Sequence, residues 1–475
     1  MKRSKRLYVL LGVLVAVCGL TFAVTKHEEK KEQIKNSDEI ILTLAKEDVT
    51  ALSWKNETTE LSFHRDESWL YDEDEAFPVS EEKMDELLGL FEEFGVSFII
   101  EDVDDYGQYG LDDPVCTILL ETADASYEIK LGDYSTMDSK RYVSIGDGNV
   151  YLVQDDPLNY YDAEIRDMID HDDLPDFDTI SQMQVAGVED YQIVYEEERH
   201  HTYSEDDVYF TERDGRTVPM DTAKVDDYLH AVSSMDLSDY VTYNVTDEEL
   251  AEYGLDDPEL TVTVDYTYAD EETKDDVEDT FVLHVARDPK ERAEAEEKEA
   301  DEASKDTEAE TGEEITAYAR VGESQIVYSI TADTYKDLMK ASYDDLRHPE
   351  VIWADLGTVH QIDVKLDGND YTITSEGDED DRTYYYGDEE LDLASLNSAL
   401  SGLTADSFTD EKPSQKEEIS LTVYLDHEDF PQVQIALYRY DGTHCLAVVD
   451  GKTVSLVQRS QAVDLIEAVN AIVLK

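Results

Sequence analysis

The sequence has few basic residues and very little cysteine. Its 475 residues include 38 Lys and Arg against 117 Asp and Glu, which gives a formal net charge of −79 at pH 7. Nucleic-acid binding needs basic patches that neutralise phosphates, so this composition argues against a nucleic-acid partner. The three cysteines, Cys18, Cys116 and Cys445, are too few for a disulfide framework or a cysteine-rich zinc site.

The motifs of common catalytic and metal sites are also missing. The chain contains no HExxH, no GxSxG, no P-loop and no glycine-rich dinucleotide fingerprint after a strand. Ser80-Glu-Glu-Lys83 matches SxxK, but the companion SDN and KTG motifs are absent and Ser80 precedes a predicted helix as a favourable N-cap. Acidic clusters such as Asp102-Val-Asp-Asp105 do not match the EF-hand loop. We therefore predict a non-enzymatic protein with no catalytic residue, cofactor or built metal site, and at most weak binding of divalent cations.

Apolar and aromatic residues are plentiful. Hydrophobic residues make up 41% of the chain and aromatic residues 9%, with 31 Tyr. Disordered chains are poor in such residues, so the composition predicts packed cores despite the charge. At roughly 100–200 residues per domain, the length predicts two to four domains.

The N-terminus predicts a membrane anchor. Residues 1–6 carry four basic side chains, and the uncharged residues 7–25 would span about 28 Å as a helix, close to the thickness of a bilayer core. We predict a cytoplasmic tail (1–6), a single transmembrane anchor through the lipid bilayer (7–25), a linker (26–38) and an extracytoplasmic remainder, located at the cell membrane. A cleaved signal peptide and a lipoprotein signal acylated at Cys18 remain alternatives, and both also place the bulk outside the cytoplasm.

A hexapeptide repeat organises the rest of the chain. Tyr109-Gly-Leu-Asp-Asp-Pro114 recurs unchanged as Tyr253-Gly-Leu-Asp-Asp-Pro258. Each copy follows an amphipathic helical pattern, over 81–94 with Ser80 as N-cap and over 221–235 with Asp221 as N-cap, and each precedes an alternating strand pattern. We predict a structural turn in which glycine supplies a positive φ and proline keeps the preceding Asp extended; a cation-binding role for the Asp pairs is the alternative. The residues assigned to the two turns are Tyr109, Gly110, Leu111, Asp112, Asp113 and Pro114, and Tyr253, Gly254, Leu255, Asp256, Asp257 and Pro258.

A third copy is recognisable without the hexapeptide, from an opening strand at 359–364, a helix at 392–403 and a closing helix at 460–473. The predicted modules are residues 39–178, 179–348 and 349–475, and residues 288–314 form an acidic insertion in the second. Each module is predicted to run strand–strand–helix–turn–strands–helix. The predicted fold class is therefore α+β, with an N-terminal transmembrane helix followed by three tandem mixed modules.

The hexapeptide with its following strand, Leu131-Gly-Asp133 and the hairpin pattern over Arg141–Val153 resemble the bacterial family DUF4340, a domain of unknown function. The resemblance implies a membrane-tethered extracytoplasmic protein, and genes of this family often lie beside ABC-transporter components and a gliding-motility-type auxiliary subunit. We therefore expect a scaffold or accessory subunit of an envelope complex, with an ABC-transporter component as one candidate partner. The alternative is a surface module that binds cell-wall polymer or divalent cations.

Overall fold

The computed structural model describes residues 34–474 except 102, 178, 198–199, 271–272, 303–314 and 379–380. The chain divides into two compact units, which separate between His171 and Asp172.

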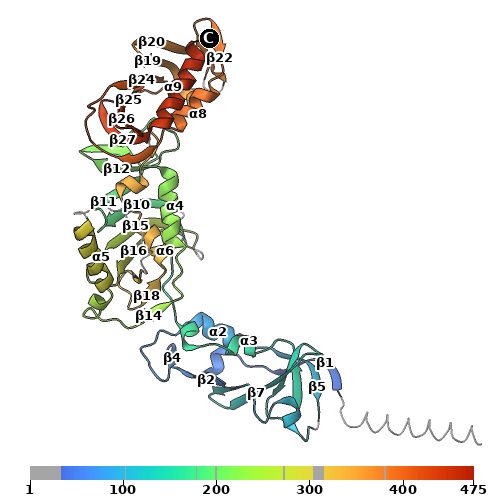
Figure 1. Ribbon diagram of the computed structural model, residues 1–475. Coiled ribbons are helices and arrows are strands. Elements are labelled where there is room, and N and C mark those ends of the chain that lie inside the picture. The colour runs from blue at the N-terminus through green and yellow to red at the C-terminus, as the bar shows by residue number, and fades with distance from the viewer. Residues whose placement is uncertain are drawn as a thin grey trace, which may run out of the picture. The chain divides into compact units, whose positions relative to one another are not determined.

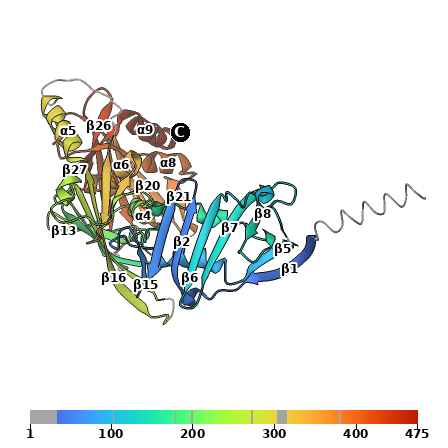
Figure 2. The ribbon, with the colours of Figure 1, turned by 90° about the horizontal axis from the view of Figure 1, so that it is seen from below.

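The first unit contains one nine-stranded antiparallel sheet with the order β1-β5-β9-β8-β7-β6-β2-β3-β4. Figure 2 shows β2, β6, β7 and β8 of this sheet side by side. Its strands are β1 (Ile34–Leu42), β2 (Val49–Asn56), β3 (Glu60–Arg65), β4 (Trp69–Tyr71), β5 (Phe94–Ile100), β6 (Cys116–Thr122), β7 (Ser126–Ser135), β8 (Lys140–Ser144) and β9 (Val150–Val153). Its helices are α2 (Glu81–Gly89) and α3 (Leu158–Tyr161), with 3-10 turns η1 (Lys46–Asp48), η2 (Tyr106–Tyr109) and η3 (Ile165–Met168).

The second unit contains two further nine-stranded antiparallel sheets (Figure 1). The second sheet is built from β10 (Thr179–Ala186), β11 (Tyr191–Tyr195), β12 (Tyr209–Arg213), β13 (Arg216–Pro219), β14 (Tyr240–Thr242), β15 (Leu260–Ala269), β16 (Asp276–Arg287), β17 (Ala317–Val321) and β18 (Val327–Ile330). The third is built from β19 (Val359–Leu366), β20 (Asn369–Glu376), β21 (Thr383–Tyr386), β22 (Glu389–Leu391), β23 (Ala405–Phe408), β24 (Glu417–Leu425), β25 (Gln432–Arg439), β26 (His444–Val449) and β27 (Lys452–Gln458). The helices are α4 (Thr222–Ser233), α5 (Pro289–Glu302), α6 (Ala332–Leu338), α7 (Tyr343–Leu346), α8 (Ala394–Ser401) and α9 (Arg459–Val473), with η4 (Leu250–Glu252) and η5 (Leu356–Thr358).

The two sheets of the second unit have the same strand order when each is numbered from its own first strand. In both, the first four strands form a meander, the first strand pairs with the sixth, and the fifth lies at the far edge beside the ninth. The sheet of the first unit follows this order with three strands in its opening meander, and β1 is added at the far edge beside β5. One strand arrangement therefore occurs three times along the chain.

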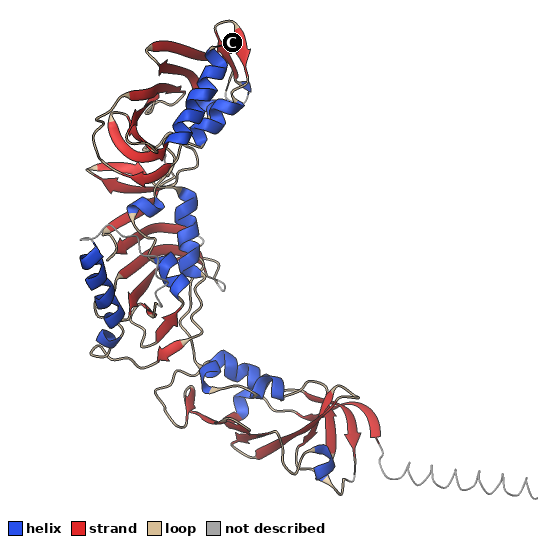
Figure 3. Ribbon diagram, in the orientation of Figure 1, coloured by secondary structure: helices blue, strands red, loops and turns tan. Residues whose placement is uncertain are grey.

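The core of each sheet lies under its helices. Along β15 the alternate residues Leu260, Val262 and Val264 are fully buried, while the residues between them are half-exposed, as expected for a strand with one covered face. Helices α8 and α9 pack side by side on one face of the third sheet (Figures 1 and 3). The predicted N-caps are confirmed at both helices: the Ser80 side chain accepts the N–H of Lys83, and Asp221 accepts those of Ala223 and Lys224.

The fold class predicted from the sequence is wrong. The described chain is mostly β, with three nine-stranded antiparallel sheets, and its helices are short, between four and fifteen residues. The error arose because strands of three residues, such as β4, β14 and β22, are too short to show an alternating pattern. These strands went uncounted, which made the helices appear to be a larger part of each module.

In the described residues no helix is long and apolar enough to cross a membrane. The predicted tail (1–6), the predicted anchor (7–25) and Cys18 lie outside the described residues, as does most of the predicted linker, whereas residues 34–38 belong to β1. In the predicted acidic insertion, residues 289–302 form α5, and residues 303–314 also lie outside the described part.

Candidate functional site

The two hexapeptides each complete a small second core. In the first unit Tyr109 and Leu111 pack with Ile100, Val150 and Leu152. Val150 and Leu152 alternate along β9, so this core covers the face of the strand opposite Tyr151 and Val153, which are also buried. The second hexapeptide does the same through Leu255, which packs with Val245, Leu250, Ala286 and Val327.

The turn geometry is nearly identical in both copies. Gly110 and Gly254 have φ angles of 71° and 72°, a left-handed conformation that favours glycine. The rings of Tyr109 and Tyr142 lie 4.9 Å apart, and the equivalent rings of Tyr253 and Tyr318 lie 5.1 Å apart. The four carboxylates that alternatively suggested a cation site, Asp112, Asp113, Asp256 and Asp257, are all exposed.

Replacing Gly132 with Ala should disrupt the first of these small cores. An added Cβ would lie 2.2 Å from the Tyr109 carbonyl oxygen and 3.0 Å from Leu111 Cγ, so the backbone of the turn must move. We expect a loss of roughly 1–3 kcal/mol in unfolding free energy, measured by chemical denaturation followed through the buried tryptophans of the first unit. Gly89→Ala is the control, because its Cβ would make only an ordinary contact, 3.6 Å from Lys46; equal stability of the two variants would contradict the proposed packing.

A buried polar network lies in the second unit where the chain passes from the second sheet to the third. Asp207, only 1% exposed, precedes β12, while His348 and Trp353 lie in the segment that connects the two sheets. The Asp207 carboxylate accepts hydrogen bonds from His348 Nε2 (2.9 Å), Trp353 Nε1 (3.1 Å) and the Thr202 hydroxyl. A buried carboxylate without such donors would be costly, so this network ties the connecting segment to the second sheet.

The His348 ring is held tightly within the network. It stacks on Trp353 with ring centroids 4.0 Å apart and an interplanar angle of 11°. Burial lowers the pKa of His348, but the hydrogen bond to the Asp207 carboxylate and the neighbouring Glu350 carboxylate outweigh it and raise the pKa to about 9. The imidazole is therefore cationic at neutral pH, and it neutralises part of the negative charge buried around it.

One group of side chains in the described part of the chain has atoms placed closely enough to hold a cation. Ligand atoms of Asp221, His348 and Glu350 all lie within 4.8 Å of one another. Each already has another role: Asp221 caps α4, and His348 Nε2 donates to Asp207 while Nδ1 lies 3.7 Å from Glu350 Oε2. A metal ion would have to displace the proton of His348, so the arrangement fits an ion-paired histidine better than a metal centre.

A column of alternating arginine and aromatic side chains also joins the second and third sheets. The guanidinium of Arg213, at the end of β12, lies 4.2 Å from the ring centroid of Tyr343 and forms an ion pair with Glu189. The Arg347 guanidinium lies 4.8 Å from the same Tyr343 ring and 4.0 Å from that of Phe408, in β23 of the third sheet. Such cation–π contacts are worth about 0.5–2 kcal/mol each and reinforce the junction.

A cavity of about 240 Å³ lies at this junction, beside the polar network. Its lining is mainly apolar and aromatic and includes Tyr203, Trp353, Phe408 and Phe430. Phe408, Phe430 and Arg347 also line a neighbouring groove of about 840 Å³, so these residues lie where the cavity meets the groove. Concave apolar sites with a few polar groups are typical binding sites, and we call this one the junction cavity.

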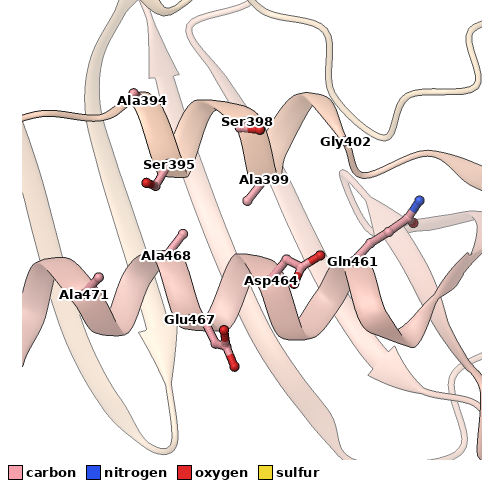
Figure 4. Close-up of a pocket in the computed structure, with 10 residues that line it drawn as sticks. All are labelled: Ala394, Ser395, Ser398, Ala399, Gly402, Gln461, Asp464, Glu467, Ala468 and Ala471. Atoms are coloured by element: carbon pink, nitrogen blue, oxygen red, sulfur yellow. The ribbon is translucent and has the colours of Figure 1, made fainter.

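A second hollow lies between α8 and α9 and is shaped mainly by small side chains. Figure 4 shows Ala399 of α8 pointing toward α9, and Asp464 and Ala468 of α9 pointing toward α8. Its volume of about 610 Å³ reflects how little space these residues fill. Because it brings together no set of converging functional groups, the junction cavity is the stronger candidate.

None of the junction residues was predicted from the sequence. Asp207, His348 and Trp353 follow no motif spacing, and Asp207 lies 141 residues before His348 in the sequence. The only local hint was a histidine followed two residues later by a glutamate, His348 and Glu350, which is too common a pattern to indicate a site.

The two cysteines of the described chain are expected to be unreactive. Burial raises the pKa of the Cys116 thiol to about 12, and burial together with the Glu418 carboxylate raises that of Cys445 to about 11. The thiolate is the reactive form, so alkylation by iodoacetamide at pH 8 should be at least ~100-fold slower in the native than in the denatured chain. Peptide mass spectrometry would measure both rates, and equal rates would show that the two strands are open to solvent.

The comparisons with known proteins identify one family. The family model described as "Domain of unknown function (DUF4340)" matches residues 69–258 and again residues 213–422. The two matches begin 144 residues apart (213 − 69), the same distance that separates the two hexapeptides (253 − 109). Comparison with curated proteins and comparison with solved structures gave no match.

Proposed function

The chain belongs to the DUF4340 family, described as a domain of unknown function, and from this premise we propose that it is a non-enzymatic scaffold or accessory subunit of an envelope complex. One observation carries the proposal: the second and third sheets repeat one strand order and form one compact unit. Repeated sheets held together in this way offer an extended surface with a fixed spacing of equivalent positions, which suits the simultaneous binding of protein partners.

The contacts at the junction support this proposal, because they hold the second and third sheets together within one unit. Through the Asp207 network and the arginine–aromatic column, the connecting segment contacts both sheets of the second unit. A chain that only tethered two independent domains would need no buried carboxylate at the connection, because linkers between independent domains are exposed and make few contacts. A fixed junction instead keeps the binding surfaces of both sheets in register.

We propose a position at the cell membrane, with the bulk of the chain outside the cytoplasm, on the N-terminal sequence alone. The basic residues before the apolar stretch 7–25 favour a cytoplasmic N-terminus. A partner in the same membrane, with an ABC-transporter component as the first candidate, follows from the family resemblance.

Affinity purification from membranes of the native host tests the scaffold proposal. A C-terminally tagged full-length chain, extracted in mild detergent, should recover at least one membrane protein in stoichiometric amount, and an untagged strain is the control. Recovery of the chain alone would overturn the proposal. Calorimetry of the full-length protein with calcium and with cell-wall fragments tests the alternative, a surface module, for which we expect heats of binding.

A further inference from the structure

We propose that the junction cavity binds a small carboxylate with an apolar or aromatic body, the carboxylate pairing with Arg347. This site is separate from the proposed scaffold role and does not depend on it. The inference rests on the nature of the cavity walls, on the state of the Arg347 guanidinium and on the charge of the chain.

The walls of the cavity leave aromatic surface partly exposed. Trp353, Phe408 and Phe430 line the cavity. Each is only half-buried, so part of its ring surface stays open to the cavity or to solvent. Tyr203 packs between two of them, with ring centroids 5.1 Å from Trp353 and 6.2 Å from Phe430. Rings held rigidly around an open space gain stabilisation when an apolar group fills it.

Arg347 supplies the polar end of the site. Its side chain is only 21% exposed, and Tyr343 and Phe408 fix its guanidinium by stacking. Of its five N–H donors, only one on Nη1 has a hydrogen-bond acceptor in the described part of the chain, Asp344 at 3.3 Å. Asp344 is 59% exposed, so this ion pair is weak and readily exchanged.

A guanidinium with free donors favours a carboxylate in particular. Its planar fork matches the two oxygens of a carboxylate in a bidentate pair, which adds strength and direction. Arg347 lines both the cavity and the groove, whereas Tyr203 and Trp353 line the cavity alone. A ligand with its carboxylate on Arg347 therefore places its apolar body against these two rings.

The cavity wall also carries two carboxylates, and both have partners within the chain: Glu350 lies 3.7 Å from His348 Nδ1, and Asp450 accepts the Gln434 N–H. His348, Trp353 Nε1 and Thr202 all bond to Asp207, so an apolar body leaves no polar group of this network unpaired. The volume of about 240 Å³ lies just below the range of about 300–1,000 Å³ usual for drug-sized ligands, which suits a body of one ring or one short branched chain.

The negative net charge of the chain reduces non-specific binding of carboxylates, which makes binding at this site easier to detect. A chain with a formal charge of −79 repels anions over most of its surface, so non-specific binding of a carboxylate is weak. Binding of a carboxylate in preference to its neutral amide would thus report a specific cationic contact.

Fluorine NMR of the full-length protein tests the proposal with 4-(trifluoromethyl)benzoate and its neutral analogue 4-(trifluoromethyl)benzamide. We expect the benzoate to bind at least ~10-fold more tightly than the benzamide. Arg347→Gln should weaken benzoate binding at least ~10-fold and leave benzamide binding unchanged. Val454→Trp, which places a larger side chain on the cavity lining, should weaken both probes.

Arg439→Gln is the matched control. Arg439 is exposed on β25 of the third sheet and does not line the cavity, so its loss should not change the affinity for the benzoate or for the benzamide. The proposal is overturned if neither probe binds the wild-type chain, if the benzamide binds as tightly as the benzoate, or if either Arg347→Gln or Val454→Trp binds the benzoate like the wild type. If Arg347→Gln does not fold, the Val454→Trp result decides between these outcomes.

Discussion

Replacing Asp207 with Ala is expected to lower the unfolding free energy of the second unit by about 3–5 kcal/mol, the range for breaking a buried ion pair by removing one partner. The substitution leaves the His348 cation and the Trp353 Nε1–H without their acceptor in a site where Asp207 itself is 1% exposed. Because the penalty comes from these unpaired groups, Asp207→Asn should cost less, since the amide keeps a hydrogen-bond acceptor but not the charge.

Hydrogen–deuterium exchange of the full-length chain measures this effect locally. Peptides around the junction and in β12 should exchange faster in Asp207→Ala, while peptides of the first unit should not change. The neighbouring substitution Asp206→Ala is the control, because Asp206 is exposed and its loss should cost no more than about 0.5 kcal/mol. Equal exchange in the two variants would show that the network does not stabilise the junction.

The stability of the second unit should fall as the pH rises through about 9. The pKa of His348 is raised to about 9 in the folded chain, from an ordinary value of 6.5. Since the folded state holds the proton more tightly, the contribution is fully present below pH 6.5 and is lost between about pH 6.5 and 9. The difference corresponds to about 3 kcal/mol at most.

The groups that face the imidazole set the direction of this change. Asp207 accepts a hydrogen bond from Nε2, and Glu350 lies 3.7 Å from Nδ1. Asp221 adds a favourable charge, and Lys224 lies close enough to Glu350 to affect that carboxylate. Denaturant titrations of the wild type and His348→Gln at several pH values would test the prediction. Between about pH 6.5 and 9, the unfolding free energy of the wild type should fall more than that of His348→Gln, because the variant has no imidazole to lose its proton. Identical pH profiles for the two chains would show that His348 is not the cause.

Local signals in the sequence were read correctly where they act over a few residues. Ser80 and Asp221 cap their helices as predicted, because an N-cap depends only on the residue and the turn that follows it. The hairpin predicted over Arg141–Val153 is also confirmed, since β8 and β9 pair antiparallel around the turn at Asp147 and Gly148. Both features are decided by neighbouring residues.

The fold class and the site required information that is not local. In the opening meanders of the second and third sheets, the third and fourth strands are short, and their pairing depends on partners brought together by the turns. The junction cavity is formed by the loop before β12, by β13, by the connecting segment and by residues of β23, β25 and β27, which meet only in the folded unit. No periodicity connects Asp207 with Trp353, so sequence reasoning had no means of pairing them.

The second hexapeptide illustrates an intermediate case. Its repetition indicated a turn, and its glycine has the positive φ that the turn requires. The leucine of the repeat was expected to be buried in the module core, but the repetition did not indicate that Leu255 lies in a separate small core on the second face of β18. That role becomes visible only when the strand order brings Val327 beside the turn.

Cross-linking followed by mass spectrometry on intact membranes of the native host tests the central claim, that the chain is a scaffold for envelope proteins, most directly. We predict cross-links from lysines of the second unit, such as Lys224, Lys340 and Lys452, to another membrane protein. Links confined to the chain itself, or formed only with cell-wall material, would contradict the scaffold and favour a surface-binding module.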